Sequence, residues 1–511
     1  MLSCRRGKGL LRWASGAEER RRSRMDTAGM KRVGAGAAVL MALGAGCFSV
    51  GPDYRAPAPA VPEAWRGTAG ESGDTMAEWW TVFGDAALEG LVADARANNR
   101  DLAAAVARME GYAASLGMAR ADYLPSAAGQ GAVEFDRQSE RVHTPPEYAA
   151  TDNPDWLTQA GFSMSWELDL WGRVRRSVEA ARGQLEASEE DVRNVQVMLQ
   201  AETAAVYIRL RTLQQQVAYA QRNIELQRET LKVVKGRFEA GLTGELDVRQ
   251  AEMNLAATTA QVPSMKAGIE QALNGLCALT GRLPGELDAL REPAPVPAAD
   301  ALPGILPADL LRRRPDIRSA ERRLAAQTAK IGVAQADYYP QLALNGTFAL
   351  AATDAGEFGR KASQDYGIGP SLSWAIFTAG KVRQRVRAEE AAARAALADY
   401  EQTVLEAYGE CEDALAALAN DGERLAALRD AVTAAEQTAA LVDELYRTGL
   451  TDFQGVLDAQ RQLAQYHDAL AQSLGQSAAD LVAAYKAFGG GWAADGPAAE
   501  EPPADAAAAR N

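Results

Sequence analysis

The feature of this sequence that most constrains its fold is an internal duplication of roughly 200 residues. The segment GMARADYLP at 117–125 returns as GVAQADYYP at 332–340, and SWELDLWGRVR at 165–175 returns as SWAIFTAGKVR at 373–383. Several matches in the same order and at nearly the same spacing are typical of a repeated structural unit. The chain is therefore predicted to build the same set of helices and strands twice.

Long helices are expected to dominate each copy. A first helix is predicted over 86–121 in one copy and 315–336 in the other, and a proline-free helix follows over 172–240 and 380–448. At 1.5 Å per residue the second helix would be about 100 Å long, far longer than the helices of ordinary globular domains. A return helix of about 38 residues then completes each copy.

Glycines mark the expected ends of these helices. Gly241 and Gly449 follow the long helices, and Gly281 and Gly489 follow the return helices, in positions where a left-handed residue commonly ends a helix. Pro263 lies inside the first return helix and predicts a kink or a break there. The two short helices of a copy, placed end to end, would nearly equal the long helix and could pair with its whole length.

Two short strands are predicted within each copy, in the segments 126–171 and 341–377, where apolar and polar residues alternate. Alternation over about ten residues suits a tilted transmembrane strand, with apolar side chains toward lipid and polar ones toward water. A half-buried sheet of a water-soluble protein would give the same pattern. The residues expected to face lipid are Phe162, Met164, Trp166, Leu168, Leu342, Leu344, Phe348, Leu372 and Trp374.

Four strands cannot close a membrane barrel alone, because the smallest bacterial barrels have about eight. An open sheet edge in lipid would leave backbone groups without hydrogen-bond partners. The strands therefore predict an oligomer, and two, three or four chains would give about eight, twelve or sixteen strands.

The first 46 residues are expected to be an extension and a lipoprotein signal peptide. A basic stretch at 30–32 precedes an apolar run that is too short to be a permanent membrane span. Small residues then precede Cys47, as in the bacterial lipobox, whose cysteine becomes acylated. We therefore expect a covalent lipid on Cys47 and transport to the outer membrane. The alternative is an ordinary buried thiol.

The composition argues against several other classes of function. The chain carries 54 Lys and Arg against 68 Asp and Glu, and this net charge of −14 argues against nucleic acid as a partner. Two histidines and four scattered cysteines, without paired spacing or a glycine-rich phosphate loop, argue against metal and thiol chemistry. We expect neither catalytic residues nor a metal site, and no cofactor apart from the lipid.

These patterns together define an expected domain order. It comprises an extension with signal peptide (1–46), an extended equatorial segment (47–85), repeat 1 (86–281), a proline-rich linker (282–307), repeat 2 (308–490) and a disordered tail (491–511).

The sequence resembles the TolC-type outer-membrane efflux proteins, in particular their lipoprotein (NodT/OprM-like) branch. The resemblance rests on PADLLRRRPDIRSAERRLAAQTAKIGVAQADYYPQLALNG at 307–346, FSMSWELDLWGRVRRSVEAAR at 162–182, GLTDFQGVLDAQRQL at 449–463 and CFSVGPDYRAPAP at 47–59. It implies an α+β membrane fold of coiled-coil hairpins with four transmembrane strands per chain. A homotrimer would then form a twelve-stranded β-barrel, continued by an α-helical barrel in the periplasm.

The resemblance also implies the function and the partners. It indicates the exit duct of a tripartite efflux pump that exports small molecules and drugs, with no enzyme activity. The partners would be a periplasmic adaptor (membrane fusion protein) and an inner-membrane pump, usually of the proton-driven RND type, as well as outer-membrane lipid. The open alternatives are a type I protein secretion channel and, less favoured, a lipidated periplasmic adaptor, which should have a single hairpin.

Candidate functional residues lie at the two helical turns far from the strands. By position, Asp247, Tyr446 and Asp458 resemble residues that close the periplasmic mouth, and Asp452 is a further gate candidate beside Thr451, where some relatives have a basic residue. The alternative for the three aspartates is helix N-capping. Adaptor contact, rather than turn chemistry alone, is expected at Gly241, Leu242, Thr243, Gly449, Leu450 and Thr451.

Overall fold

The computed structural model describes residues 49–59, 62, 64–66, 76–136, 155–299, 309, 311, 313–354 and 356–492. The signal peptide, Cys47 and nearly all of the expected tail lie outside the described residues. The chain divides into two compact units. We call the described residues within 49–52, 120–177 and 331–386 the sheet unit, and the other described residues the helical unit.

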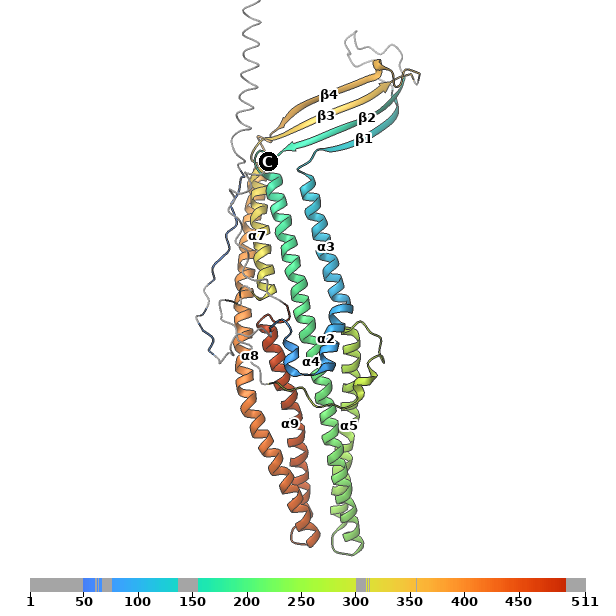
Figure 1. Cartoon of the computed structure of the whole chain (residues 1–511), viewed down its shortest axis with the longest axis vertical. Helices are drawn as coiled ribbons and strands as arrows, with labels where there is room; N and C mark the ends of the chain where they lie inside the picture. Colours follow the sequence, from blue (N-terminus) through green and yellow to red (C-terminus); the bar gives the residue numbers. More distant parts are fainter. Residues whose placement is uncertain are drawn as a thin grey trace, which may run out of the picture. The chain divides into compact units, whose positions relative to one another are not determined.

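The sheet unit contains one antiparallel sheet with the strand order β1-β2-β3-β4 (Figure 1). Its strands are β1 (Ser126–Asp136), β2 (Asp155–Leu168), β3 (Gln341–Ala352) and β4 (Gln364–Ser373). Two strands therefore come from each copy of the repeat. Hairpins β1-β2 and β3-β4 each pair within a copy, and β2 pairs with β3 across the two copies.

The register confirms that apolar and polar side chains lie on opposite faces. Phe162 lies opposite Phe348, and Leu342 lies opposite both Leu168 and Leu372. This register places every residue predicted to face lipid on one face, apart from Trp374. On the other face the Ser165 hydroxyl donates to Asn345 Oδ1 (2.9 Å), and Asn345 Nδ2 donates to Ser371 Oγ (2.7 Å). A polar network thus lines the face opposite the apolar side chains.

The prediction that Trp374 belongs to a strand is wrong. β4 ends at Ser373, which is the partner of Gln341. The next residue would have to pair with Pro340, which has no N–H to donate. Trp374 instead donates from its indole Nε1 to the Tyr338 carbonyl at 3.1 Å. It therefore stabilises the end of the sheet without being part of it.

The turn between β4 and the following helix holds a residue in a strained conformation. Among the described residues, Ala379 is the only non-glycine residue with a positive φ, at 48°. This conformation brings Cβ close to the following carbonyl oxygen and costs about 1 kcal/mol or more.

We expect Ala379→Gly to raise the free energy of unfolding by about 1 kcal/mol, measured by thermal unfolding in detergent. Ala375→Gly is the control, and a gain no larger than that of the control would contradict the prediction.

Seven helices of the described chain belong wholly or mostly to the helical unit. Their bounds are α2 (Ala86–Asn98), α3 (Arg100–Ala121), α4 (Arg173–Glu239), α5 (Glu245–Leu279), α7 (Pro315–Ala336), α8 (Lys381–Thr448) and α9 (Phe453–Ala487). With 67 and 68 residues, α4 and α8 confirm the two predicted long helices. Return helices α5 and α9 have 35 residues each. None of the described helices is long and apolar enough to cross a membrane.

The predicted first helix of repeat 1 is not continuous. It stops at Asn98 and restarts at Arg100, because Asn99 adopts an extended conformation and caps α3. Its Oδ1 accepts from the backbone N–H groups of Asp101 (2.9 Å) and Leu102 (3.0 Å). Its Nδ2 donates to the Leu279 carbonyl at 2.9 Å. The break therefore joins the end of the return helix α5 to the start of α3.

Of the kink or break predicted at Pro263, the break is wrong, because α5 continues through this residue. Proline removes one backbone donor from the helix. Contacts with α4 on both sides of the proline hold the helix in place: Lys235 pairs with Glu252 at 3.0 Å, and Gly268 lies against Leu213.

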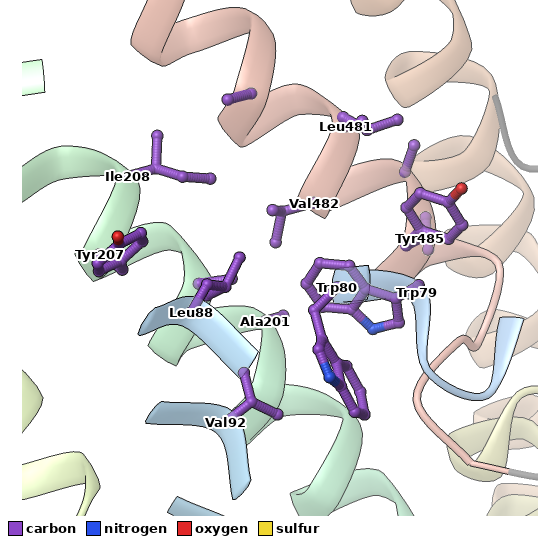
Figure 2. Close-up of a cluster of buried hydrophobic side chains, with 14 of the residues drawn as sticks. Trp79, Trp80, Leu88, Val92, Ala201, Tyr207, Ile208, Leu481, Val482 and Tyr485 are labelled. Carbon is purple, nitrogen blue, oxygen red and sulfur yellow. The ribbon is translucent and has the colours of Figure 1, made fainter. Parts of the chain in front are cut away.

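The core of the helical unit gathers around a short 3-10 helix, η2 (Trp79–Phe83). Trp79 is fully buried and stacks on Tyr485 of α9, with ring centroids 5.6 Å apart. Figure 2 shows Leu88, Tyr207 and neighbouring apolar side chains of α2, α4 and α9 in the same cluster. The segment before repeat 1 is thereby packed between helices of both copies.

Candidate functional site

The turns that join each long helix to its return helix have the same backbone geometry. Gly241 has a φ of 73° and Gly449 one of 81°, which confirms the predicted left-handed residues. In the first turn the N–H of Leu242 donates to the Arg237 carbonyl at 2.8 Å, and in the second Leu450 donates to Leu445 at 2.9 Å. These bonds satisfy carbonyls that a helix end leaves free.

Four of the six residues predicted to contact an adaptor are exposed at the turns, and the other two, Thr243 and Thr451, are half-buried. The side chains of Leu242 and Leu450 are 66% and 76% exposed, at equivalent positions of the two copies. The two copies therefore present the same apolar side chain to water at equivalent turns. Adaptor contact nevertheless stays a prediction for the six residues named above.

We call the end of each helical hairpin, where its turn lies, a tip. The two tips share one apolar cluster, which we call the tip core. Its buried members come from four helices and are Val234, Val248, Ala251, Tyr446, Phe453, Val456 and Leu457. Tyr446, a predicted gate residue, is 2% exposed, and its ring lies 5.6 Å from that of Phe453. Its hydroxyl has no hydrogen-bond partner among the described residues. Within one chain Tyr446 therefore packs in the tip core.

Arg237 joins the two tips directly, and the sequence analysis did not single it out. From α4, its Nη1 donates to the carbonyls of Tyr446 (3.0 Å) and Arg447 (3.3 Å), in the last turn of α8. Its Cζ lies 4.8 Å from the centre of the Tyr446 ring. A cation at a helix C-terminus is favourable because the free carbonyls carry partial negative charge. Arg237 thus holds the first hairpin to the second.

The predicted gate aspartates have three different environments. Asp452 is the N-cap of α9 and accepts from the N–H of Gly455 at 3.1 Å, so the capping alternative is confirmed for this residue. Asp247 lies in the first turn of α5 and accepts a hydrogen bond from the Thr243 hydroxyl. Asp458 lies further along α9 and accepts from Gln454 Nε2 at 3.0 Å, so capping is wrong for it.

A pair of carboxyl groups, one on α8 and one on α9, makes the stability of the helical unit depend on pH. Burial and then a hydrogen bond with Asp421 raise the pKa of Asp480 to about 6. An unfolded Asp has a pKa near 4. Between about pH 4 and pH 6 the folded chain therefore binds more protons than the unfolded chain. The free energy of unfolding consequently falls as the pH rises through this window. We expect Asp480→Asn to remove this fall and to stabilise the protein at pH 7.5 by about 1 kcal/mol, a modest value because Asp480 is partly exposed.

Thermal unfolding of both proteins at pH 4 and pH 7.5 measures this effect. The two melting temperatures should approach each other at the lower pH, where Asp480 is protonated in the folded protein and about half protonated in the unfolded chain. Asp468→Asn, a further α9 aspartate that accepts from Gln216 (2.6 Å) and Gln472 (2.8 Å), is the control. An equal pH dependence for wild type and Asp480→Asn would show that the pair does not titrate as described.

Comparison with known proteins relates this architecture to one family. The sequence profile of the family described as "Outer membrane efflux protein" matches residues 91–282 and 306–490. The solvent efflux pump outer membrane protein SrpC of Pseudomonas putida is 33% identical over 464 residues, which cover 89% of this chain and 97% of that protein. Nodulation protein T of Rhizobium leguminosarum bv. viciae is 33% identical over 465 residues, with 90% and 93% covered.

A solved structure agrees with the sequence comparisons. The outer-membrane channel OprN superimposes with a TM-score of 0.80 and 37% sequence identity, over 87% of this chain and 99% of that one. The duplicated helical hairpins and the four-stranded sheet with one apolar face therefore form the architecture of an efflux channel of the outer membrane. The chain belongs to the outer membrane efflux protein family.

Proposed function

We propose that three copies of this chain form the exit duct of a tripartite efflux pump, through which small organic molecules and drugs leave the cell. The observation that carries the proposal is the sheet with one apolar face and two open edges. β1 and β4 each pair with only one described strand. Because unpaired backbone groups are costly in lipid, each edge requires a partner strand from another copy. Three copies would contribute twelve strands.

The nature of the cargo is inferred from relatives. SrpC is named as part of a solvent efflux pump and a further relative of the same identity, TtgI, as part of a toluene efflux pump. Small apolar compounds are therefore the substrate class that we propose for this chain. The duct itself would catalyse nothing and would act only as a passage.

The proposed partners are a periplasmic adaptor and an inner-membrane pump of the RND type. The exposed leucines of the two tips supply apolar contacts for the adaptor, and the gate would lie in the same region. Opening requires the tips to move, so that an adaptor which binds Leu242 and Leu450 is well placed to drive the movement.

Two measurements test the proposed function. The full-length chain, purified in detergent, should have the mass of a trimer by light scattering and should form conducting pores in planar bilayers. In cells that lack their own efflux channel, co-expression with a cognate adaptor and pump should restore resistance to toluene. A monomer without conductance would overturn the proposal.

The lipid on Cys47 is a separate proposal with its own prediction. Cys47→Ser should abolish acylation, because a hydroxyl cannot replace the thiol as the lipid acceptor. Intact-mass spectrometry should show the loss of the lipid mass. Cys277→Ser, at a buried cysteine within α5, is the control and should keep the lipid. A lipid mass that persists in Cys47→Ser would disprove the assignment.

A further inference from the structure

The two copies of the repeat differ in charge where a strand leads into a long helix. In the first copy Glu167 Oε1 accepts from Arg173 Nε at 2.7 Å, and Asp169 Oδ2 accepts from Arg175 Nε at 3.2 Å. Asp169 also caps α4 by accepting from the N–H of Val174 at 3.0 Å. Each of the two cations therefore has a carboxylate of its own in the sheet unit.

The second copy keeps both cations and lacks both acids. Lys381 and Arg383 occupy the positions of the two paired arginines, and Ala375 and Phe377 occupy the positions of the two carboxylates. Lys381 and Arg383 are exposed, and neither forms an ion pair with any of the described residues. Two neighbouring cations are thus free to bind an anion.

Exposed apolar side chains precede these cations by only a few positions in the sequence. Trp374 is 55% exposed, Ile376 81% and Phe377 89%. They follow directly after β4 in the chain, and the last residues of that strand include Leu372, which is 67% exposed on the apolar face of the sheet. Aromatic and apolar groups next to Lys and Arg are the composition of a protein surface at the boundary between lipid tails and headgroups.

We propose that residues 374–383, here called the boundary patch, bind an anionic phospholipid of the outer membrane. Lys381 and Arg383 would hold the phosphate, while Trp374 and Phe377 contact the acyl chains. The proposal rests on the proposed function in one respect, namely that the sheet spans the membrane. Charge complementarity favours an anionic lipid over a zwitterionic one, because the patch offers two cations and, among its own residues, no carboxylate.

The first test counts bound lipid by native mass spectrometry of the full-length protein released from detergent. The probes are dioleoylphosphatidylglycerol and dioleoylphosphatidylcholine at equal concentrations. Lys381→Gln/Arg383→Gln should weaken phosphatidylglycerol binding about 30-fold, since each cation near an anionic lipid surface contributes about a factor of five. The control removes two exposed cations of the helical unit, Lys232→Gln/Arg424→Gln, and should bind lipid as the wild type does.

A second variant keeps the cations and restores the acids of the first copy. Ala375→Glu/Phe377→Asp should reduce phosphatidylglycerol binding to a similar extent, because the new carboxylates would pair with Lys381 and Arg383. Inorganic phosphate at the same concentration should not displace the lipid, because it lacks acyl chains. Displacement by phosphate would show that the patch binds a free anion and would overturn the lipid assignment.

The remaining outcomes separate this inference from the proposed function. Wild-type lipid binding by both double variants, or an equal loss in the control, would overturn the boundary patch while trimer mass and conductance stay intact. If the double variants dissociate into monomers, the patch contacts a second copy of the chain, and the lipid proposal is wrong. A monomeric, non-conducting wild type would instead refute the proposed function.

Discussion

Arg237→Ala should raise the open probability of the channel strongly, to the point where macroscopic conductance in planar bilayers increases several-fold. Any opening that separates the two tips of a chain must break both hydrogen bonds from Arg237 and its contact with the Tyr446 ring. Two charge-assisted bonds and a cation–π contact together are worth about 3 kcal/mol. Their loss should shift the ratio of open to closed tips by about 100-fold.

The tip offers a matched control for this prediction. Arg249 is also an arginine of the tip region, but its partners Glu245 and Glu252 lie on its own helix, α5. Arg249→Ala should therefore leave the conductance unchanged. Arg237→Lys should be intermediate, because it keeps the charge and loses the planar fork. Conductance at the wild-type level in a trimeric Arg237→Ala variant would mean that the bonds between the tips do not hold the closed state.

Arg314→Ala should destabilise the helical unit by about 2 to 3 kcal/mol, less than for a fully buried charge pair because Glu410 stays half exposed to water. Arg314 is 8% exposed and reaches three elements. Its guanidinium donates to the Ala487 carbonyl at the end of α9 (3.0 Å), to Glu410 of α8 (2.7 Å) and to Asp316 at the start of α7 (2.6 Å). Alanine would remove the charged donor that these three acceptors share and would leave the Ala487 carbonyl only the weak Cys411 thiol donor.

Chemical unfolding followed by circular dichroism at the helical minimum measures this loss. Arg424→Ala removes an exposed arginine of α8 and should change the free energy of unfolding by no more than about 0.5 kcal/mol. A change of similar size for Arg314→Ala would show that Arg314 does not join the three helices. Arg314→Lys distinguishes charge from geometry, since lysine can replace only part of the fork.

Arg314 and Asn99 show how the duplication extends into the tertiary structure. Each lies immediately before the helix that leads to a strand pair, and each donates to a carbonyl at the end of the return helix of its own copy, Ala487 or Leu279. The repeated sequence predicted equivalent helices. It did not predict these equivalent contacts, because asparagine and arginine share no recognisable pattern and reach the same kind of acceptor by different geometry.

At the two tips as well, local sequence patterns predicted some features and tertiary packing determined others. Gly241 and Gly449 were predictable, because a left-handed residue after a long helix is a local requirement. The burial of Tyr446 and the role of Arg237 were not predictable. An arginine in the last turn of a helix is expected to interact with its own helix end, and nothing local indicates that it caps another helix more than 200 positions away.

The sequence by itself determined the duplication, the length of the two long helices, the turns that end them and the alternation that gives the sheet an apolar face. These features follow from local periodicity and from the conformations that glycine and proline allow. Only the tertiary structure decided that Asn99 divides the first helix, that α5 continues through Pro263, that β4 stops before Trp374 and that Arg237 joins the tips. Each of these features depends on a contact with a residue distant in sequence, and such a contact produces no periodic pattern in the sequence.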